Sequence, residues 1–459
     1  MAISTDQNIL SLLKVYYKDG VEVENLMFRN DPVLKDLNKT RIEGKAYDFS
    51  AMYGRGGACS ADYTVAKKVA AQNTKNAEFS VIPGQLFSAC SFNQKEILAS
   101  KTKPGAFMKV AGAKFFAASE AFRKQLAASI YGRGYGELAK ANYAGAVTSG
   151  TPFVLTLPSH AVMAIDIDSQ LVVKAKVEDV AVKTKLTVTA IDDANGKVTV
   201  VPSTSVTIAN SDIVAFDGSV DASGNPLLPM GLAGWLPTIG KRTGTAWNNY
   251  IKTNFFGVNR SVAPSRLAGA FVDGTGDTKK SDTLIKLIQQ ARRQGSNADL
   301  IVLNDDDWKD ITKEIQNTNM YLSDTKTTSK RQLNVGLDKF SVSFSTNFID
   351  SVVDTPYCPK GTFYVLDKSA IELATYTNAE KIVDGVPGNE PGKPDPTQES
   401  FDGGNAYALN VNDYISVQPG ADSVDGPSSV VSLALFGGIA VINPSNCGVG
   451  LFADAEVLE

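Results

Sequence analysis

The chain has 459 residues, 43% of them hydrophobic, which is enough for two or three domains with real cores and excludes global disorder. Its 45 basic and 49 acidic residues give a formal net charge of −4, so it lacks the basic surplus of a protein that binds nucleic acid tightly. The four cysteines, Cys59, Cys90, Cys358 and Cys447, are scattered, which predicts reduced thiols. We expect no signal peptide and no transmembrane segment.

Residues 1–43 are expected to form an N-terminal arm. A helix over residues 5–18 would place five apolar side chains on one face: Ile9, Leu12, Leu13, Tyr16 and Tyr17. That face could dock on a neighbouring subunit or pack on its own domain, and the sequence leaves both interpretations open. A helix lying on a membrane surface would need a strongly basic face, which two lysines do not supply.

Residues 44–98 predict a long two-stranded hairpin. Tyr47, Phe49 and Ala51 alternate with polar neighbours, and strands over 78–82 and 85–92 flank a Pro-Gly pair. The sequence YGRGG at 53–57 interrupts the first strand, and a short helix over 61–72 is possible. Because a hairpin of this kind has no core of its own, it must lie on its own body or on a neighbouring subunit.

Residues 99–150 contain the central element, a helix from Pro104 to about Tyr131. Seven apolar residues recur at steps of three and four: Phe107, Ala111, Phe115, Ala118, Phe122, Leu126 and Ile130. Many alanines on this helix would let another layer, expected to be a sheet, approach closely. Glu120, Arg123 and Lys124 are expected to face solvent on the opposite side.

Residues 151–220 are rich in valine and threonine and predict a small inserted antiparallel β-module, as a partly closed barrel. Asn195-Gly196 between two alternating runs is a strong hairpin signal. Residues 221–280 are loop-rich, and four aromatic residues are expected to anchor them: Trp235, Trp247, Phe255 and Phe256.

The remainder alternates helix and strand. Helices are expected over 281–294 and 305–317 with a buried strand at 299–303 between them, and strands over 340–353, 361–375, 406–418 and 429–442. The run at 430–442 is apolar throughout but too short to span a membrane, so it predicts a buried core strand.

Residues that could carry chemistry each have a simpler interpretation, so we predict no catalytic, cofactor or metal site and a protein that is not an enzyme. His160 is the only histidine and has no partner signal. Asp305–Asp307 fit an acidic helix N-terminus better than a metal site. GTGDTKK at 274–280 lacks the spacing of a phosphate-binding loop. Cys358 is expected to be a buried small hydrophobe.

Two glycine-rich turns, at 53–57 and 131–136, each carry an arginine that could bridge acidic groups on a neighbouring subunit; alternatively both are simply solvated turns. Six residues are therefore candidates for a subunit interface: Arg55, Lys67, Lys68, Arg133, Tyr16 and Tyr17.

The order of these segments resembles the major capsid protein of a tailed bacteriophage with the HK97-type fold. The most specific stretches are GRGGACSADYTVAKKVAA, PGQLFSACSFNQKEILASK, AFRKQLAASIYGRGYGEL, NADLIVLNDDDW and VVDTPYCPKGTFYVLD. The resemblance implies an α+β fold with an extended E-loop at 44–98, a spine helix in a peripheral domain at 99–150, and an axial domain at 281–340. The resemblance assigns 221–280 to peripheral loops, and 341–459 to peripheral strands and remaining axial segments, with part of 420–445 in the axial domain.

The same resemblance implies subunits that assemble as pentamers and hexamers into an icosahedral head around double-stranded DNA, which they contact only non-specifically. Portal and possibly scaffold, head-fibre or decoration proteins would be the other partners, with no cofactor and no membrane. Such a protein would be located in the virion after assembly in the bacterial cytoplasm. An encapsulin-like cellular shell around cargo enzymes is the alternative.

Overall fold

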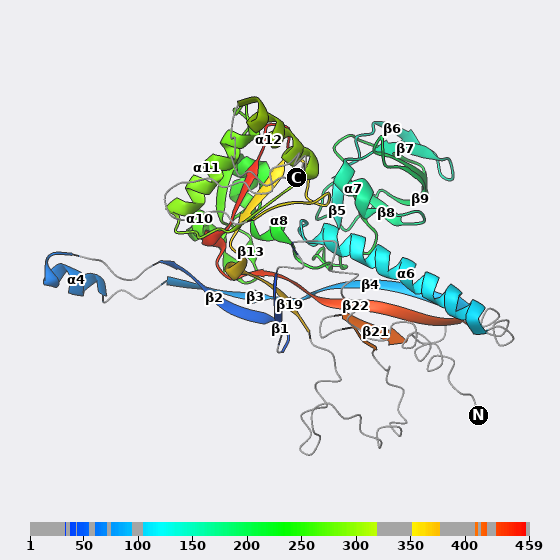
Figure 1. Cartoon of the computed structure of the whole chain (residues 1–459), viewed down its shortest axis with the longest axis horizontal. Helices are drawn as coiled ribbons and strands as arrows, with labels where there is room; N and C mark the ends of the chain where they lie inside the picture. Colours follow the sequence, from blue (N-terminus) through cyan, green and yellow to red (C-terminus); the bar gives the residue numbers. More distant parts are fainter. Residues whose placement is uncertain are drawn as a thin grey trace, which may run out of the picture.

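A computed structural model of the protein describes residues 33, 37–42, 44–54, 60–70, 75–93, 104–318, 351–376, 409–411, 415–419 and 428–455. Long strands form an elongated base, a long helix lies along it, and two separate bodies stand on the same side (Figure 1). A hairpin extends from one end of the base. The expected helix at 5–18 lies outside the described residues, as do Tyr16, Tyr17 and Arg55.

The base is a six-stranded sheet in the order β1-β19-β22-β21-β20, with β4 also paired to β22. The strands are β1 (Asn38–Arg41), β4 (Gly84–Asn93), β19 (Ile371–Thr375), β20 (Leu409–Val411), β21 (Ile415–Pro419) and β22 (Ser428–Val441). β4 and β22 are antiparallel from the pair Gly84–Gly437 to the pair Asn93–Ser428, and they form a long ribbon.

Helix α6 (Pro104–Ser129) covers one face of this ribbon, which confirms the predicted helix and its sheet neighbour. Phe122 and Leu126 of α6 are buried in the same cluster as Leu86 of β4 and Leu435 of β22. The Ser88 hydroxyl of β4 donates to the main-chain oxygen of Ala118 at 2.9 Å. This half-buried bond joins strand and helix directly, in place of a bond to water.

The predicted solvent-facing side of α6 needs one correction, because Arg123 is buried. Its guanidinium donates to both carboxylate oxygens of Glu120, at 3.0 and 2.5 Å, one turn earlier on the same helix. Burial is possible because this bidentate pair neutralises the charge. An amphipathic pattern alone does not reveal such a pair.

The hairpin consists of β2 (Tyr47–Gly54) and β3 (Lys75–Val81), with helix α4 (Tyr63–Ala70) at its tip. The strands are antiparallel and form a two-stranded sheet of their own. The predicted hairpin and tip helix are therefore present. Residues 84–93 do not belong to the hairpin, because β4 pairs along its length with β22 and turns Leu86 and Cys90 into the main core.

The β-module is an antiparallel sheet in the order β5-β12-β8-β9-β10-β7, whose pairing leaves β5 and β7 as its ends. Its strands are β5 (Glu137–Lys140), β7 (Phe153–Thr156), β8 (Gln170–Lys174), β9 (Thr184–Asp192), β10 (Lys197–Pro202) and β12 (Ile213–Phe216). A second pair joins β6 (Gly145–Val147) to β11 (Val206–Ile208), and α7 (Ser159–Ala164) packs on α6. The module thus begins at β5, before residue 151.

The predicted hairpin turn of this module is confirmed. Gly196 has a φ of +64°, and a Cβ at this position would lie 2.6 Å from the main-chain oxygen of Leu157. Only glycine combines that backbone conformation with such a close approach. The module has its own core, which includes Leu171, Leu186 and Val200.

The second body is an α/β unit around a five-stranded sheet in the order β15-β23-β18-β16-β17. Its elements are β15 (Ala270–Asp273), α11 (Lys280–Arg293), β16 (Leu300–Leu303), α12 (Asp305–Thr318), β17 (Ser351–Asp354), β18 (Thr362–Leu366), the 3-10 turns Lys368–Ala370 and Pro444–Asn446 at its border, and β23 (Gly448–Leu451). The helices and strands predicted around 281–317 are confirmed. β22, however, belongs to the base sheet, so only β23 brings the C-terminal region into this unit.

Short elements between the module and the α/β unit anchor the hairpin root. They are α8 (Leu232–Trp235), a 3-10 turn (Ile239–Arg242), α9 (Gly244–Tyr250), β13 (Asn254–Phe255), β14 (Val258–Asn259), a second 3-10 turn (Arg260–Val262) and α10 (Pro264–Leu267). The indole of Trp235 is fully buried and donates to the oxygen of Ile439 at 2.7 Å. The aromatic anchors predicted here are therefore real.

Candidate subunit-contact surfaces

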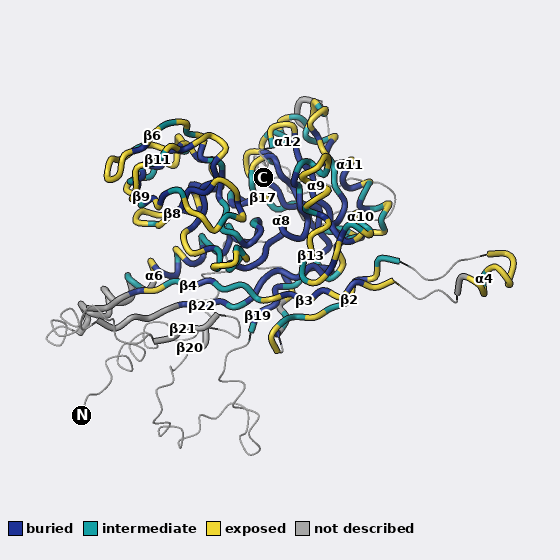
Figure 2. Tube along the Cα trace, turned by 180° about the vertical axis from the view of Figure 1, so that it is seen from behind, coloured by how far each residue is buried: buried dark blue, intermediate teal, exposed yellow. Residues whose placement is uncertain are grey.

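The hairpin has one apolar face and one polar face. Ala77, Phe79 and Val81 are buried, whereas the alternate residues Glu78 and Ser80 are exposed. Alternation of this kind is produced by a strand that lies with one face on a core. The exposed side is thus available for contact along the whole described ribbon (Figure 2).

Aromatic stacking holds the root of the hairpin on the body. Phe49 stacks on Phe79 with ring centroids 5.5 Å apart, and Phe79 meets the edge of Trp235 at 5.3 Å. The amide of Ser80 donates to the oxygen of Phe256 at 3.0 Å. These contacts make the root part of the folded body.

A half-buried carboxylate also ties the root to β19. Glu372 accepts hydrogen bonds from the hydroxyls of Thr40, at 2.6 Å, and Tyr47, at 2.9 Å. Burial, together with the bonded carboxylate, raises the pKa of Tyr47 to about 12, so the phenol remains a donor. The hydroxyl of Tyr47 therefore stays bonded over the physiological pH range.

Unlike the root, the tip of the hairpin exposes its apolar side chains. Tyr63 of α4 is 79% exposed and Val65 is 48% exposed, while Met52 near the end of β2 is 59% exposed. Asp62 caps the helix by accepting from the amide of Thr64 at 2.8 Å. An isolated helix of eight residues is only marginally stable in water, so this tip has both apolar surface and helical structure that a partner would stabilise.

The predicted interface residues are distributed unevenly. Lys67 and Lys68 are exposed on α4, on the tip. Arg133 is instead buried, and Glu137 accepts from its main-chain amide at 2.6 Å and from its Nε at 3.4 Å. The expectation that Arg133 reaches a neighbour is corrected, because the carboxylate that it pairs with lies four residues later in its own turn.

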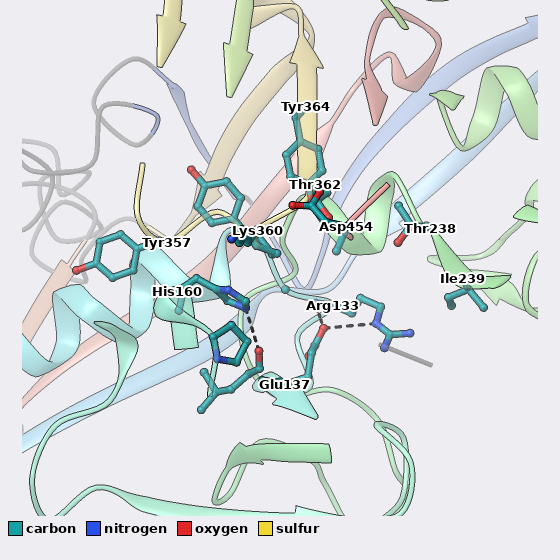
Figure 3. Close-up of a pocket in the computed structure, with 18 residues that line it drawn as sticks. Arg133, Glu137, His160, Thr238, Ile239, Tyr357, Lys360, Thr362, Tyr364 and Asp454 are labelled. Atoms are coloured by element: carbon teal, nitrogen blue, oxygen red, sulfur yellow. Dashed lines mark hydrogen bonds and ion pairs between the residues drawn. The ribbon is translucent and has the colours of Figure 1, made fainter. Parts of the chain in front are cut away.

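A cavity of about 180 Å³ lies where α6, the β-module and the α/β unit meet. Figure 3 shows His160, Glu137 and Arg133 on one side of it and Tyr357 and Lys360 on the other. His160 Nε2 donates to the oxygen of Leu138 at 3.2 Å, since a carbonyl can only accept. Burial lowers the pKa of His160 to about 4, so the imidazole is neutral at pH 7.

Within the described residues, no hydroxyl or thiol is hydrogen-bonded to His160 or Glu137. His160 Nε2 bonds to the main chain and Glu137 Oε1 bonds to Arg133, while His160 Nδ1 and Glu137 Oε2 are buried without a hydrogen-bond partner. Cys358 is buried and donates weakly to the oxygen of Thr362, as predicted for a small hydrophobe. The three described cysteines are all buried, and none of them forms a disulfide within the described residues. In the described residues, no three His, Cys, Asp or Glu side chains gather as a metal would require.

A charge cluster that the sequence did not predict stabilises the α/β unit. Lys280 at the start of α11 donates to Asp307 at 2.7 Å, Asp454 at 3.0 Å and Asp310 at 3.1 Å. Asp307 is fully buried and also accepts from the amide of Gly361. The predicted acidic N-terminus of α12 is present, but its third aspartate, Asp307, forms an internal ion pair with Lys280.

None of the helices in the described part of the chain has the length and apolar character needed to cross a membrane.

Comparison with known proteins finds similarity to shell-forming proteins. The chain matches the capsid protein of cyanophage A-1(L) with a TM-score of 0.48 and 13% identity over 93% of both chains. It matches the capsid of a native GTA particle with a TM-score of 0.40 and 11% identity over 92% of this chain and 89% of that chain. An encapsulin of Synechococcus elongatus gives a TM-score of 0.38 and 8% identity, with coverages of 92% and 88%. No family model and no curated protein matches the sequence.

These matches have TM-scores below 0.5 and identities of 13% or less. At such low identity a shared fold does not assign a function, which depends on the surfaces of this chain.

Proposed function

We propose that the chain is the major capsid protein of a tailed bacteriophage, which assembles as pentamers and hexamers into an icosahedral head around double-stranded DNA. The observation that supports this most strongly is the tip of the hairpin. Its apolar side chains, Tyr63 and Val65, are exposed in the single chain although they belong to a formed helix. Identical copies of the chain would be the partner that covers them.

In this proposal β2, β3 and α4 are the E-loop, α6 is the spine helix, and the α/β unit is the axial domain. The elongated base and the two bodies above one face suit a subunit of a thin shell (Figure 1). Obligate interfaces typically bury about 2,000–5,000 Å², which an extended subunit reaches by overlapping its neighbours. The net charge of −4 keeps contacts with packaged DNA weak and non-specific.

Deletion of residues 54–75 tests this proposal. We expect the shortened chain to fold, because the core around α6 and Trp235 does not include α4, and to lose the ability to close shells. The measurement is electron microscopy together with light scattering on purified full-length and shortened protein. Normal shells from the shortened chain would contradict the role assigned to the hairpin, and a full-length chain that remains monomeric at high concentration would contradict the capsid function itself.

The encapsulin-like alternative predicts the same shells with different contents. Particles purified from the native source would then hold a cargo enzyme rather than double-stranded DNA. Nuclease protection and mass spectrometry of purified particles distinguish the two.

A further inference from the structure

Two buried acceptor atoms line the cavity where α6, the β-module and the α/β unit meet. Glu137 of β5 accepts from Arg133 through Oε1, and its side chain is only 5% exposed. His160 of α7 donates from Nε2 to the main chain, so its Nδ1 carries the lone pair. Neither Glu137 Oε2 nor His160 Nδ1 has a hydrogen-bond partner in the described part of the chain. Because buried polar atoms in proteins are nearly always hydrogen-bonded, these two acceptors indicate a ligand that supplies donors.

The cavity has room for a small organic molecule. Its volume is about 180 Å³, whereas a single water needs only about 10–15 Å³ and a cavity of about 150 Å³ accommodates benzene. Small side chains from three elements leave this space open, namely Ala128 of α6, Ala139 of β5 and Ala233 of α8. The two acceptors therefore face a volume that fits a ligand of several non-hydrogen atoms.

A second cavity, beside the Lys280 cluster, differs in that its carboxylates are already bonded. Asp310 and Asp454 accept from Lys280 at 3.1 and 3.0 Å. Glu314 accepts from the main-chain amides of Lys280 and Ser281 at the start of α11. The charges around that cavity thus stabilise the fold, whereas the acceptors of Glu137 and His160 are still available to a ligand.

The wall opposite Glu137 and His160 carries a cation (Figure 3). Lys360 is exposed there, and its amine forms no ion pair with any residue that the structure describes. Asp454, which also lines the cavity, is bonded to Lys280. Acceptors on one wall and an ammonium on the other are complementary to a molecule with an amine at one end and a carboxylate at the other.

Tyrosine rings form part of the wall between these charges. The rings of Tyr131 and Tyr364 lie with their centroids 6.1 Å apart, and Tyr357 lines the same cavity. Aromatic faces attract ammonium groups and also pack against apolar methylene groups. A short alkyl chain between the amine and the carboxylate therefore suits this wall.

We propose that this cavity binds a small zwitterion in which a short alkyl chain joins a primary ammonium to a carboxylate. The ammonium donates to Glu137 Oε2 and His160 Nδ1, and the carboxylate pairs with Lys360. Glu137 belongs to the β-module and Lys360 lies just before β18 of the α/β unit, so the bound molecule joins the two bodies. The site lies within one chain, and the proposal therefore does not depend on the proposed capsid function.

Isothermal titration calorimetry of the full-length chain tests this site. The probes are glycine, β-alanine and γ-aminobutyrate, which carry the same two charges on chains of increasing length, with butylamine and butyrate as singly charged controls. We expect at least one zwitterion to bind about tenfold more tightly than either control, because each control leaves one wall unpaired. The proposal is overturned if no zwitterion binds, or if butylamine or butyrate binds equally well.

Three variants locate the binding site. Glu137→Gln keeps an acceptor for Arg133 but replaces the other oxygen by a donor, so the affinity for the best zwitterion should fall at least about tenfold. Lys360→Met should cause a similar fall for the zwitterion and leave the affinity for butylamine within about twofold. The matched control is Lys309→Met, which removes an exposed lysine of α12 outside the cavity lining and should stay within about twofold of the parent.

Filling the cavity gives an independent check that leaves its polar groups in place. Ala233→Leu should abolish binding of the zwitterion, and circular dichroism verifies that each variant is folded. Parent-like affinity in the folded Glu137→Gln and Ala233→Leu variants would show that the cavity is not the binding site. Electron microscopy of the same variants measures shell assembly separately, so failure of this proposal and failure of the proposed function are distinguishable.

Discussion

The ribbon under α6 and the tip of the hairpin place their apolar residues in opposite environments. Phe122 on α6 is 1% exposed in the core of the chain, whereas Tyr63 on α4 is almost fully exposed. Both are aromatic residues on helices, and both follow a helical pattern in the sequence. Under the proposed function, the body carries the fold and the tip makes contacts between copies. Changes in the body should therefore alter stability, and changes at the tip should alter assembly.

Phe122→Asp is expected to have the largest effect, because it buries an unpaired charge in the main core. The free energy of unfolding should fall by at least about 4 kcal/mol, enough to leave the chain insoluble or unfolded. Phe116→Asp is the matched control, since Phe116 lies on the exposed side of the same helix. Thermal unfolding followed by circular dichroism compares the two, and equal stability would contradict the assignment of the core face.

Lys280→Met tests the charge cluster in the α/β unit. It leaves Asp307 buried without its cation, so we expect a loss of about 3 kcal/mol in the free energy of unfolding. The neighbouring Lys279→Met removes the same charge from an exposed position and should change stability by less than about 0.5 kcal/mol. Denaturant unfolding gives both values. Similar losses for both variants would show that the cluster is not a structural ion pair.

His160 should make the body sensitive to acid. Its folded pKa of about 4 lies below the ordinary value of 6.5, so the unfolded chain binds a proton first as the pH falls. The contribution of His160 to the free energy of unfolding is therefore constant above pH 6.5. Between pH 6.5 and 4 it lowers the free energy of unfolding, by at most about 3 kcal/mol. His160→Gln should lose less stability than the parent over this interval. Parallel stability curves for the two chains would contradict the burial of the imidazole.

Tyr63→Ser/Val65→Ser should have the smallest effect on the single chain. Both side chains are exposed, so the free energy of unfolding should change by no more than about 0.5 kcal/mol. Assembly should nevertheless require about tenfold more protein, because the variant buries less apolar surface against a neighbouring copy. Light scattering measures this shift. A destabilised monomer would mean that the tip packs on its own body.

The sequence predicted those features that depend on local pattern. The periodicity of Phe122, Leu126 and Ile130 identified α6, and Asn195-Gly196 identified the β9–β10 hairpin. Features that depend on distant partners were missed. Residues 85–92 read as a strand, but its partner β22 lies more than 300 residues later, and no local signal specifies that register. For the same reason the mixed sheet of the α/β unit, which draws strands from 270 to 451, could not be assembled from the sequence.

The charged residues that the sequence analysis expected to be accessible lie in different environments. Lys67 and Lys68 lie on the exposed tip, but Arg123 and Arg133 are buried because Glu120 and Glu137 pair with them. Sequence spacing brings both pairs within reach, at three and four residues, yet it does not tell whether such a pair lies inside or outside. The Lys280 cluster combines α11, α12 and the C-terminal segment, so it exists only in the folded chain.

Hydroxyl-radical footprinting of the full-length chain, dilute and assembled, tests the central claim most directly. We expect Tyr63 to be modified rapidly in dilute protein and to be protected in assembled particles, while Tyr364, buried in the body, is protected in both. A Tyr63 that is equally reactive in both states, or protected already in the single chain, would contradict the account.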